Sequence, residues 1–178
     1  MTQVTMTRKE LEYIDSDDSL ALLIEKASES PYLAIDTEFI REKTYYPNLC
    51  LIQLAYESHS GDTDFTKQAS GERGNQKPDN GIFADMHTAI IDPFEINDLR
   101  MFRTLLENED IVKIFHAGYQ DVEILLHETG VLPKNVFDTQ IAATLLGQAQ
   151  QPGLGAVVST FMGISLRKSR NHGTFAAT

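Results

Sequence analysis

Two carboxylates at the end of an apolar strand constrain this chain more than any other feature. Residues 32–39 read Tyr-Leu-Ala-Ile-Asp-Thr-Glu-Phe, so Asp36 and Glu38 are spaced i, i+2. In an extended strand this spacing points both side chains to the same face of the sheet. Two like charges so placed repel each other unless a cation lies between them, and oxygen ligands of this kind suit magnesium or manganese. Taken alone, the run is equally compatible with a solvated strand end.

Length and composition bound the class of protein. The chain has 178 residues, 42% of them hydrophobic, and a net charge of −11, which suits one domain with a real core. The acidic balance argues against broad, non-specific binding to nucleic acid, but it leaves room for an enzyme that engages a few phosphates through metal ions. No apolar run is long enough for a membrane span, and the first ten residues contain no apolar signal segment.

The cysteine count bears on location. Cys50 is the one cysteine of the chain and cannot form an internal disulfide, which fits a reducing compartment. We therefore expect a cytoplasmic protein without a membrane partner. The sequence gives no sign of a particular protein partner.

The order of elements indicates an α/β domain. Strands are predicted near residues 32–38, 49–56, 87–92, 111–115 and 136–137. Helices are predicted near residues 20–27, 99–106, 120–126, 139–146 and 154–161. Three strands followed by alternating helix and strand predict a mixed five-stranded sheet with flanking helices, in a single domain over residues 1–178. Residues 57–81 are rich in glycine and polar side chains, which favours a flexible insertion loop.

Asp121 is the third candidate acid. It follows the fourth predicted strand in Phe-His-Ala-Gly-Tyr-Gln-Asp, where Gly118 would permit unusual backbone angles. Asp121 falls in the first turn of a helix, a place where a carboxylate is favoured in any case. If the first and fourth strands are neighbours, Asp121 lies towards Asp36 and Glu38. Three converging carboxylates are difficult to explain without cations.

Longer segments around these acids resemble the ribonuclease D family. Residues 34–40 and 44–55 resemble its first exonuclease motif, residues 113–123 resemble its second, and residues 137–143 resemble the segment that follows. The order and spacing agree over residues 20–168, apart from the predicted insertion. The resemblance implies a ribonuclease-H-like fold and a two-metal 3′-5′ exoribonuclease. Such an enzyme trims RNA 3′ ends, including those of tRNA precursors, and releases nucleoside 5′-monophosphates.

By this match, Asp36, Glu38 and Asp121 are the candidate catalytic carboxylates and metal ligands. The implied cofactors are two divalent metal ions, Mg²⁺ or Mn²⁺, which activate water and stabilise the leaving oxygen. The implied partner is RNA with a single-stranded 3′ end.

Four further residues are weaker candidates. Tyr45, Tyr46 and His116 are candidate substrate contacts, although packing of the hairpin and a structural hydrogen bond explain them equally well or better. Asp138 is a candidate fourth acid. Its position matches an acidic residue that the family does not use as a principal ligand, and we favour helix capping for it.

The chain departs from the family near residues 167–168 and beyond. The third motif, Tyr-x-x-x-Asp, should follow residues 161–168, but no Asp, Glu or Tyr occurs after Asp138. The simplest hypothesis is a truncation or frameshift near residue 167, so that the C-terminal part of the catalytic domain is missing. We then expect weak activity or none, because a metal ligand and the residue that orients water are lost.

Alternatives from other classes remain. A catalytically dead nucleic-acid-binding or scaffold module with the same fold fits the missing motif, whereas the three remaining acids argue against it. A nucleotide-binding doubly wound domain is disfavoured because no glycine-rich phosphate loop is present. Proofreading exonucleases stay open as relatives, although the segments at residues 44–47 and 116–118 favour ribonuclease D.

Overall fold

The computed structural model describes residues 11–41, 46–57 and 86–166. The chain divides into two compact units, Met1–Asp138 and Thr139–Thr178. Beyond Glu57, the predicted loop at residues 57–81 lies outside the described residues. Within the described ranges, no helix has both the length and the apolar character that a membrane crossing would require.

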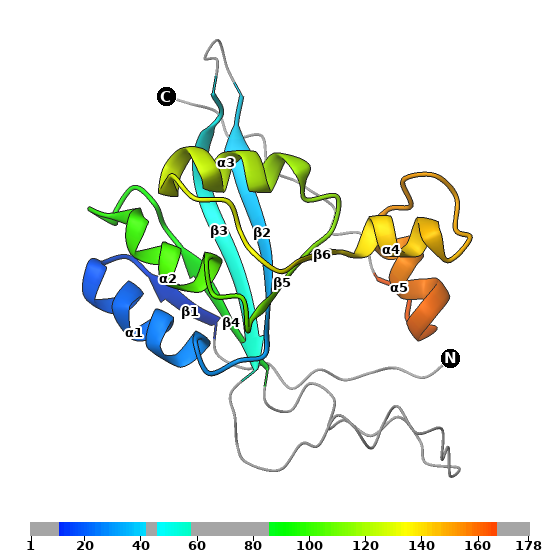
Figure 1. Cartoon of the computed structure of the whole chain (residues 1–178), viewed down its shortest axis with the longest axis horizontal. Helices are drawn as coiled ribbons and strands as arrows, with labels where there is room; N and C mark the ends of the chain where they lie inside the picture. The colour runs from blue at the N-terminus through cyan, green and yellow to red at the C-terminus, as the bar shows by residue number, and fades with distance from the viewer. Residues whose placement is uncertain (1–10, 42–45, 58–85, 167–178) are drawn as a thin grey trace. The chain divides into compact units, whose positions relative to one another are not determined.

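The first unit is built on a mixed sheet of six strands (Figure 1). The strands are β1 (Leu11–Ile14), β2 (Tyr32–Ile40), β3 (Asn48–Glu57), β4 (Met86–Ile91), β5 (Val112–Phe115) and β6 (Val136–Asp138). Their spatial order is β1-β4-β3-β2-β5-β6. β3 runs antiparallel to β2 and β4, and the other neighbours are parallel. The predicted neighbourhood of the first and fourth strands is confirmed as the parallel pairing of β2 with β5.

The expectation of five strands is wrong by one. The additional strand, β1, pairs in parallel with β4 at the edge of the sheet, with Leu11 opposite Thr88 and Ile14 opposite Ile91. Leu-Glu-Tyr-Ile is a four-residue run whose burial is uneven, and only Ile14 is fully buried. Such a short edge segment carries no periodic signal of its own. It becomes a strand because β4, far along the chain, supplies its hydrogen bonds.

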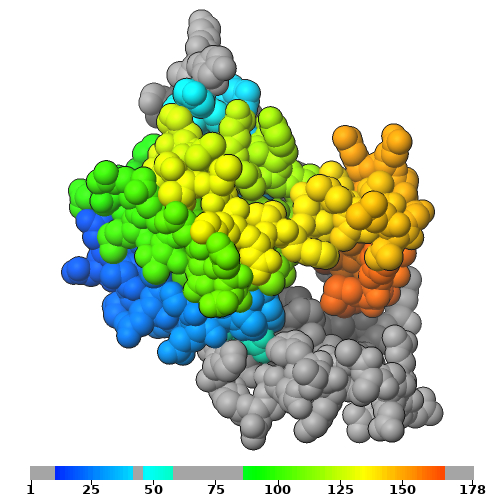
Figure 2. All heavy atoms as spheres, in the orientation of Figure 1, coloured from blue at the N-terminus to red at the C-terminus, as the bar shows by residue number. Residues whose placement is uncertain are grey.

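Helices α1 (Asp17–Ala27), α2 (Arg103–Leu106) and α3 (Tyr119–Thr129) lie against one face of this sheet (Figure 1). α1 begins at the predicted place, with Ser16 and Ser19 forming a capping box. The predicted helix at residues 99–106 is a 3₁₀ turn, η3 (Leu99–Phe102), that continues into α2. In Figure 2 the side chains of α1 and of the segment from η3 to α3 form a continuous surface over the sheet.

Alternation along β2 separates a core face from an acidic face. Leu33, Ile35 and Thr37 are buried, whereas Asp36 and Glu38 are exposed. The buried side chains join a core that includes residues of β3, β4 and the three helices. Because β2 lies between β3 and β5, the two acids stand on a central strand of the sheet. The parallel β5 leads directly into α3, so the first turn of α3 lies near the carboxyl end of β2.

The second unit contains α4 (Thr139–Leu145) and α5 (Leu154–Met162). Both helices agree with the sequence prediction to within one residue. Gly163 ends α5 in the left-handed conformation, with its N–H bonded to the carbonyl of Ser159.

Candidate active site

Asp36 is held in an environment that disfavours its charge. Partial burial raises the pKa of Asp36 above its ordinary value, and the carboxylates of Asp121 and Glu38 raise it further. The Thr37 amide and His116 act in the opposite direction. Across the sheet, Gln53 donates from Nε2 to Asp36 Oδ2 at 3.4 Å. The charges of both other predicted acids, Asp121 and Glu38, therefore act on the Asp36 carboxylate.

Asp121 is a buried carboxylate, 8% exposed, at the start of α3. Thr37 donates to its Oδ1 twice, from the backbone N–H at 3.0 Å and from the hydroxyl at 2.6 Å. Thr37 belongs to the core face of β2 and is itself 7% exposed. These two bonds tie the first helical turn of α3 to the strand segment between the paired acids. They use Oδ1 and fix the direction in which Oδ2 points.

The turn between β5 and α3 consists of His116, Ala117 and Gly118. The predicted unusual backbone angles do not fall on Gly118, whose φ is −75°, but on Ala117, whose φ is +57°. Gly118 is required for another reason, because a Cβ there would lie 2.4 Å from the Cβ of Phe115. Glycine is thus needed for close approach and not for a left-handed conformation.

The Asp138 side chain also forms hydrogen bonds with the backbone of this turn. Its Oδ1 accepts a hydrogen bond from the Ala117 N–H at 3.2 Å, and its Oδ2 accepts one from the Gly118 N–H at 2.9 Å. Asp138 is the last residue of β6 and pairs in register with Phe115, the last residue of β5. The structure therefore brings Asp138 to the residues just before α3.

The predicted tyrosines have different outcomes. Tyr45 lies outside the described residues. Tyr46 stacks on His127 of α3, with ring centroids 4.3 Å apart and planes inclined by 27°. Arg41, just after β2, and Glu123 of α3 also form an ion pair, with 3.7 Å between Nη2 and Oε2. Tyr46 thus packs the β2–β3 hairpin against α3, and its proposed contact with substrate stays a prediction.

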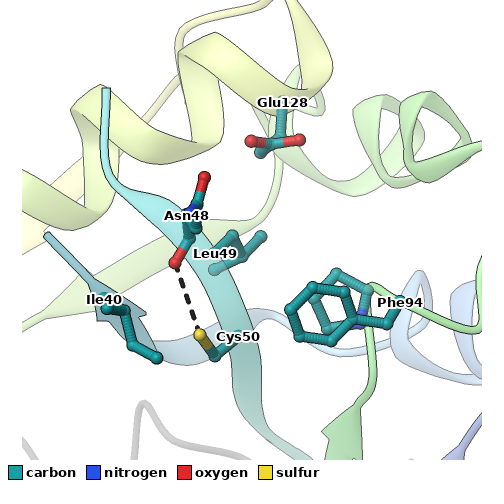
Figure 3. Close-up of a pocket in the computed structure, with 7 residues that line it drawn as sticks. Ile40, Asn48, Leu49, Cys50, Phe94 and Glu128 are labelled. Carbon is teal, nitrogen blue, oxygen red and sulfur yellow. Dashed lines mark hydrogen bonds between the residues drawn. The ribbon is translucent and has the colours of Figure 1, made fainter. Parts of the chain in front are cut away.

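A hollow of about 440 Å³ lies beside the last residue of β2 and the first residues of β3 (Figure 3). It is lined by Ile40, Asn48, Leu49, Cys50, Pro93, Phe94 and Glu128. The half-buried Cys50 donates from Sγ to the carbonyl of Asn48 at 3.4 Å, the dashed line in Figure 3. None of the three predicted acids lines this hollow, so it is distinct from the acidic site.

The acidic residues fit a hard divalent cation by their chemistry. All of the candidate donors are carboxylate oxygens. After burial, the carboxylates of Asp121 and Glu38 raise the pKa of Asp36, and a cation would relieve this part of the shift. In the part of the chain that the structure describes, no three His, Cys, Asp or Glu side chains are already arranged around a common metal position. The donor set thus fits, whereas a finished coordination shell is not formed by these side chains alone.

Two residues in the site were missed by the sequence analysis. Thr37 stands between the two acids, and its core-facing position in an apolar strand was a signal that a buried hydroxyl needed a partner. Gln53 lies directly opposite Asp36 on β3. It could have been identified only once the register of the hairpin was known.

The mixed sheet with paired carboxylates on a central strand defines an α/β protein of the ribonuclease-H-like class. The solved structure of Escherichia coli RNase D, an exoribonuclease involved in structured RNA processing, matches with a TM-score of 0.69 and 34% identity. The match covers 93% of this chain and 36% of that one. The predicted fold class is therefore confirmed.

The chain belongs to the 3′-5′ exonuclease family, whose model matches residues 11–73 and 79–174. Ribonuclease D of Zymomonas mobilis is 40% identical over 157 residues, which are 87% of this chain and 33% of that protein. The resemblance to ribonuclease D is thereby confirmed. The chain spans about a third of the length of the curated relatives it matches.

A more distant structure, Brucella melitensis NrnC with bound Mg²⁺, matches with a TM-score of 0.56 and 21% identity. The match covers 94% of this chain and 68% of that one. At this identity the likeness concerns the fold alone.

Proposed function

We propose that this chain carries the metal-binding carboxylates of a 3′-5′ exoribonuclease of the ribonuclease D type. The observation that carries the proposal is the pair of hydrogen bonds from Thr37 to the buried Asp121, which holds this acid against the strand that carries Asp36 and Glu38. After partial burial, the charges of Asp121 and Glu38 are the next causes that raise the pKa of Asp36. Membership of the exonuclease family supports the same reaction.

Asp36, Glu38 and Asp121 would hold two divalent ions, Mg²⁺ or Mn²⁺. When bound, such ions supply Lewis acidity to a phosphodiester and lower the pKa of water. The chain's own residues have defined parts in this site. Gln53 orients Asp36, Thr37 fixes Oδ1 of Asp121, and His116 acts to lower the pKa of Asp36.

The proposed substrate is the single-stranded 3′ end of an RNA, with tRNA precursors as the proposed physiological source and nucleoside 5′-monophosphates as the product. This follows from the likeness to ribonuclease D and from the description of the Escherichia coli enzyme as an exoribonuclease of structured RNA. Tyr46 and His116 are the proposed substrate contacts. A cytoplasmic setting stays a prediction from cysteine usage.

Metal binding tests the proposal independently of turnover. Calorimetric titration with MnCl₂ is expected to show binding by the unmodified chain and its loss in Asp36→Asn. Asp110→Asn is the matched control, because it removes the same charge from an exposed position outside the site. If the unmodified chain binds no Mn²⁺, or if Asp36→Asn binds as well as Asp110→Asn, the proposal is wrong.

A second measurement addresses catalysis. The chain contains no Tyr-x-x-x-Asp motif after α3, so we expect slow release of mononucleotides from 3′-labelled single-stranded RNA with Mn²⁺. The missing third motif favours one alternative, a catalytically dead nucleic-acid-binding or scaffold module with the same fold. That alternative predicts RNA binding that is equal in the presence of Mn²⁺ and of a chelator.

A further inference from the structure

The turn that introduces α3 is short and includes a residue in a left-handed conformation. Three residues connect the end of β5 to the first residue of α3. Ala117 adopts a left-handed conformation at φ +57°, which is unfavourable for a residue other than glycine. Gly118, the N-cap residue, has no side chain with which to cap the helix. Because the N-cap residue offers no acceptor side chain, an acceptor from another element can support this turn.

Asp138 provides that support from a neighbouring strand. Its two oxygens accept from two successive backbone amides, Ala117 at 3.2 Å and Gly118 at 2.9 Å. Register pairing of Asp138 with Phe115 places the carboxylate beside the point where the chain leaves β5. A negative charge at this place also interacts favourably with the N-terminal end of the α3 dipole.

We propose that Asp138 is a positioning residue of the acidic site and not its fourth metal ligand. The inference rests on the proposed function. Asp121 is only three residues beyond Gly118, so the angle of this turn decides where Asp121 meets Thr37 and Asp36. Contact between Gly118 and Phe115 closes the turn on its other side.

The hydrogen bonds of Asp138 separate its role from that of the other acids. Asp36 and Glu38 stand exposed on one face of β2. Asp138 instead directs both oxygens at backbone N–H groups, which compensate its charge without a metal. Asp138, for which the sequence favoured helix capping over a role as fourth acid, thus acts on the site through the backbone of the turn.

Asp138→Asn tests the proposal because it keeps the shape and replaces one acceptor oxygen by a donor. One of the two amide bonds is then lost. In protein labelled with ¹⁵N-glycine, we expect hydrogen exchange of the Gly118 amide to accelerate by about tenfold or more. The Gly130 amide is the internal control, since it bonds to Leu126 at the other end of α3 and should not change.

Titration with MnCl₂ provides the second readout. A positioning role predicts an unchanged number of bound ions and an affinity weakened by about 10-fold to 100-fold, as for outer partners of metal ligands. Asp138→Glu keeps both oxygens and the charge, so it should recover part of the affinity. It also carries the test if the asparagine variant does not fold.

Three results would overturn the proposal. Loss of one bound ion in Asp138→Asn would make Asp138 a ligand. Faster exchange of the Gly118 amide with unchanged Mn²⁺ affinity would make the role of Asp138 purely structural. Unchanged exchange of the Gly118 amide would show that the hydrogen bonds to Asp138 do not support the turn. Failure of the proposed function is seen separately, as absence of Mn²⁺ binding in the unmodified chain.

Discussion

Thr37 and Asp121, 84 residues apart in the chain, are joined by two hydrogen bonds to a single carboxylate oxygen. Both residues are buried, and the hydroxyl bond of 2.6 Å is short, as is typical of a charged acceptor. This pair joins the strand that carries Asp36 and Glu38 to the helix that carries Asp121. The geometry of the acidic site thus depends on a residue that is not itself acidic.

Replacing Thr37 by valine should destabilise the protein. Valine keeps the shape but removes one donor to a buried carboxylate, which costs about 1.5–3 kcal/mol. Thr37→Ser keeps the hydroxyl and loses only a methyl group, a cost of about 1 kcal/mol. The free energy of unfolding in urea at neutral pH measures both variants. Equal stability of the valine variant and the unmodified protein would show that the hydroxyl contributes nothing.

Gly118→Ala should destabilise by overpacking. The new Cβ would lie 2.4 Å from the Cβ of Phe115, and relieving that clash costs about 1–3 kcal/mol. Gly155→Ala is the control, because its Cβ would meet no atom within 4 Å and alanine is the better helix former. Thermal unfolding followed by circular dichroism should show a lower Tm for Gly118→Ala and no decrease in Tm for Gly155→Ala. A tolerated Gly118→Ala would mean that Phe115 moves freely.

Tyr56 should make the protein sensitive to alkali. The phenol is 1% exposed, donates to Glu12 Oε1 at 3.3 Å and stacks on His87. Burial, followed by the nearby charge of Glu12, raises the pKa of Tyr56 to about 12 from its ordinary value of 10.0. Because the folded pKa is raised, the stabilisation is complete below pH 10 and is lost as the pH rises towards 12.

Tyr56→Phe provides the comparison for this prediction. The unfolding free energy of the unmodified protein should fall more steeply between pH 10 and pH 12 than that of the variant, as followed by circular dichroism and tyrosinate absorbance. Tyr32 carries a similarly raised pKa and remains in both proteins, so it does not affect the difference. Parallel curves would contradict an ionisation linked to burial of Tyr56.

Tyr46 should stabilise the hairpin through its ring and not through its hydroxyl. Tyr46→Ala removes the stack on His127 and should cost about 0.5–1.5 kcal/mol of unfolding free energy. Tyr46→Phe keeps the ring and should be close to neutral. A double-mutant cycle with His127→Ala measures the coupling between the two rings. A coupling energy near zero would leave contact with substrate as the remaining reason for Tyr46.

Much of this protein could be read from local sequence. The alternation of apolar and acidic residues in β2 placed Asp36 and Glu38 on one face, and the structure shows them exposed there. The caps, the glycine at the end of α5 and the α/β order follow from short-range preferences of the chain. The family motifs likewise consist of contiguous residues, so one sequence is enough to recognise them.

Tertiary structure alone decided which residues support the acids. Strand β1 exists because β4 pairs with it, Gln53 faces Asp36 because of the hairpin register, and Thr37 meets Asp121 because β5 lies beside β2. Asp138 reads as an acid in the sequence, but its oxygens bind backbone amides brought to it by the pairing of β6 with β5. The reason is physical: residue type and spacing fix what a side chain can do, whereas long-range packing fixes which partner it meets.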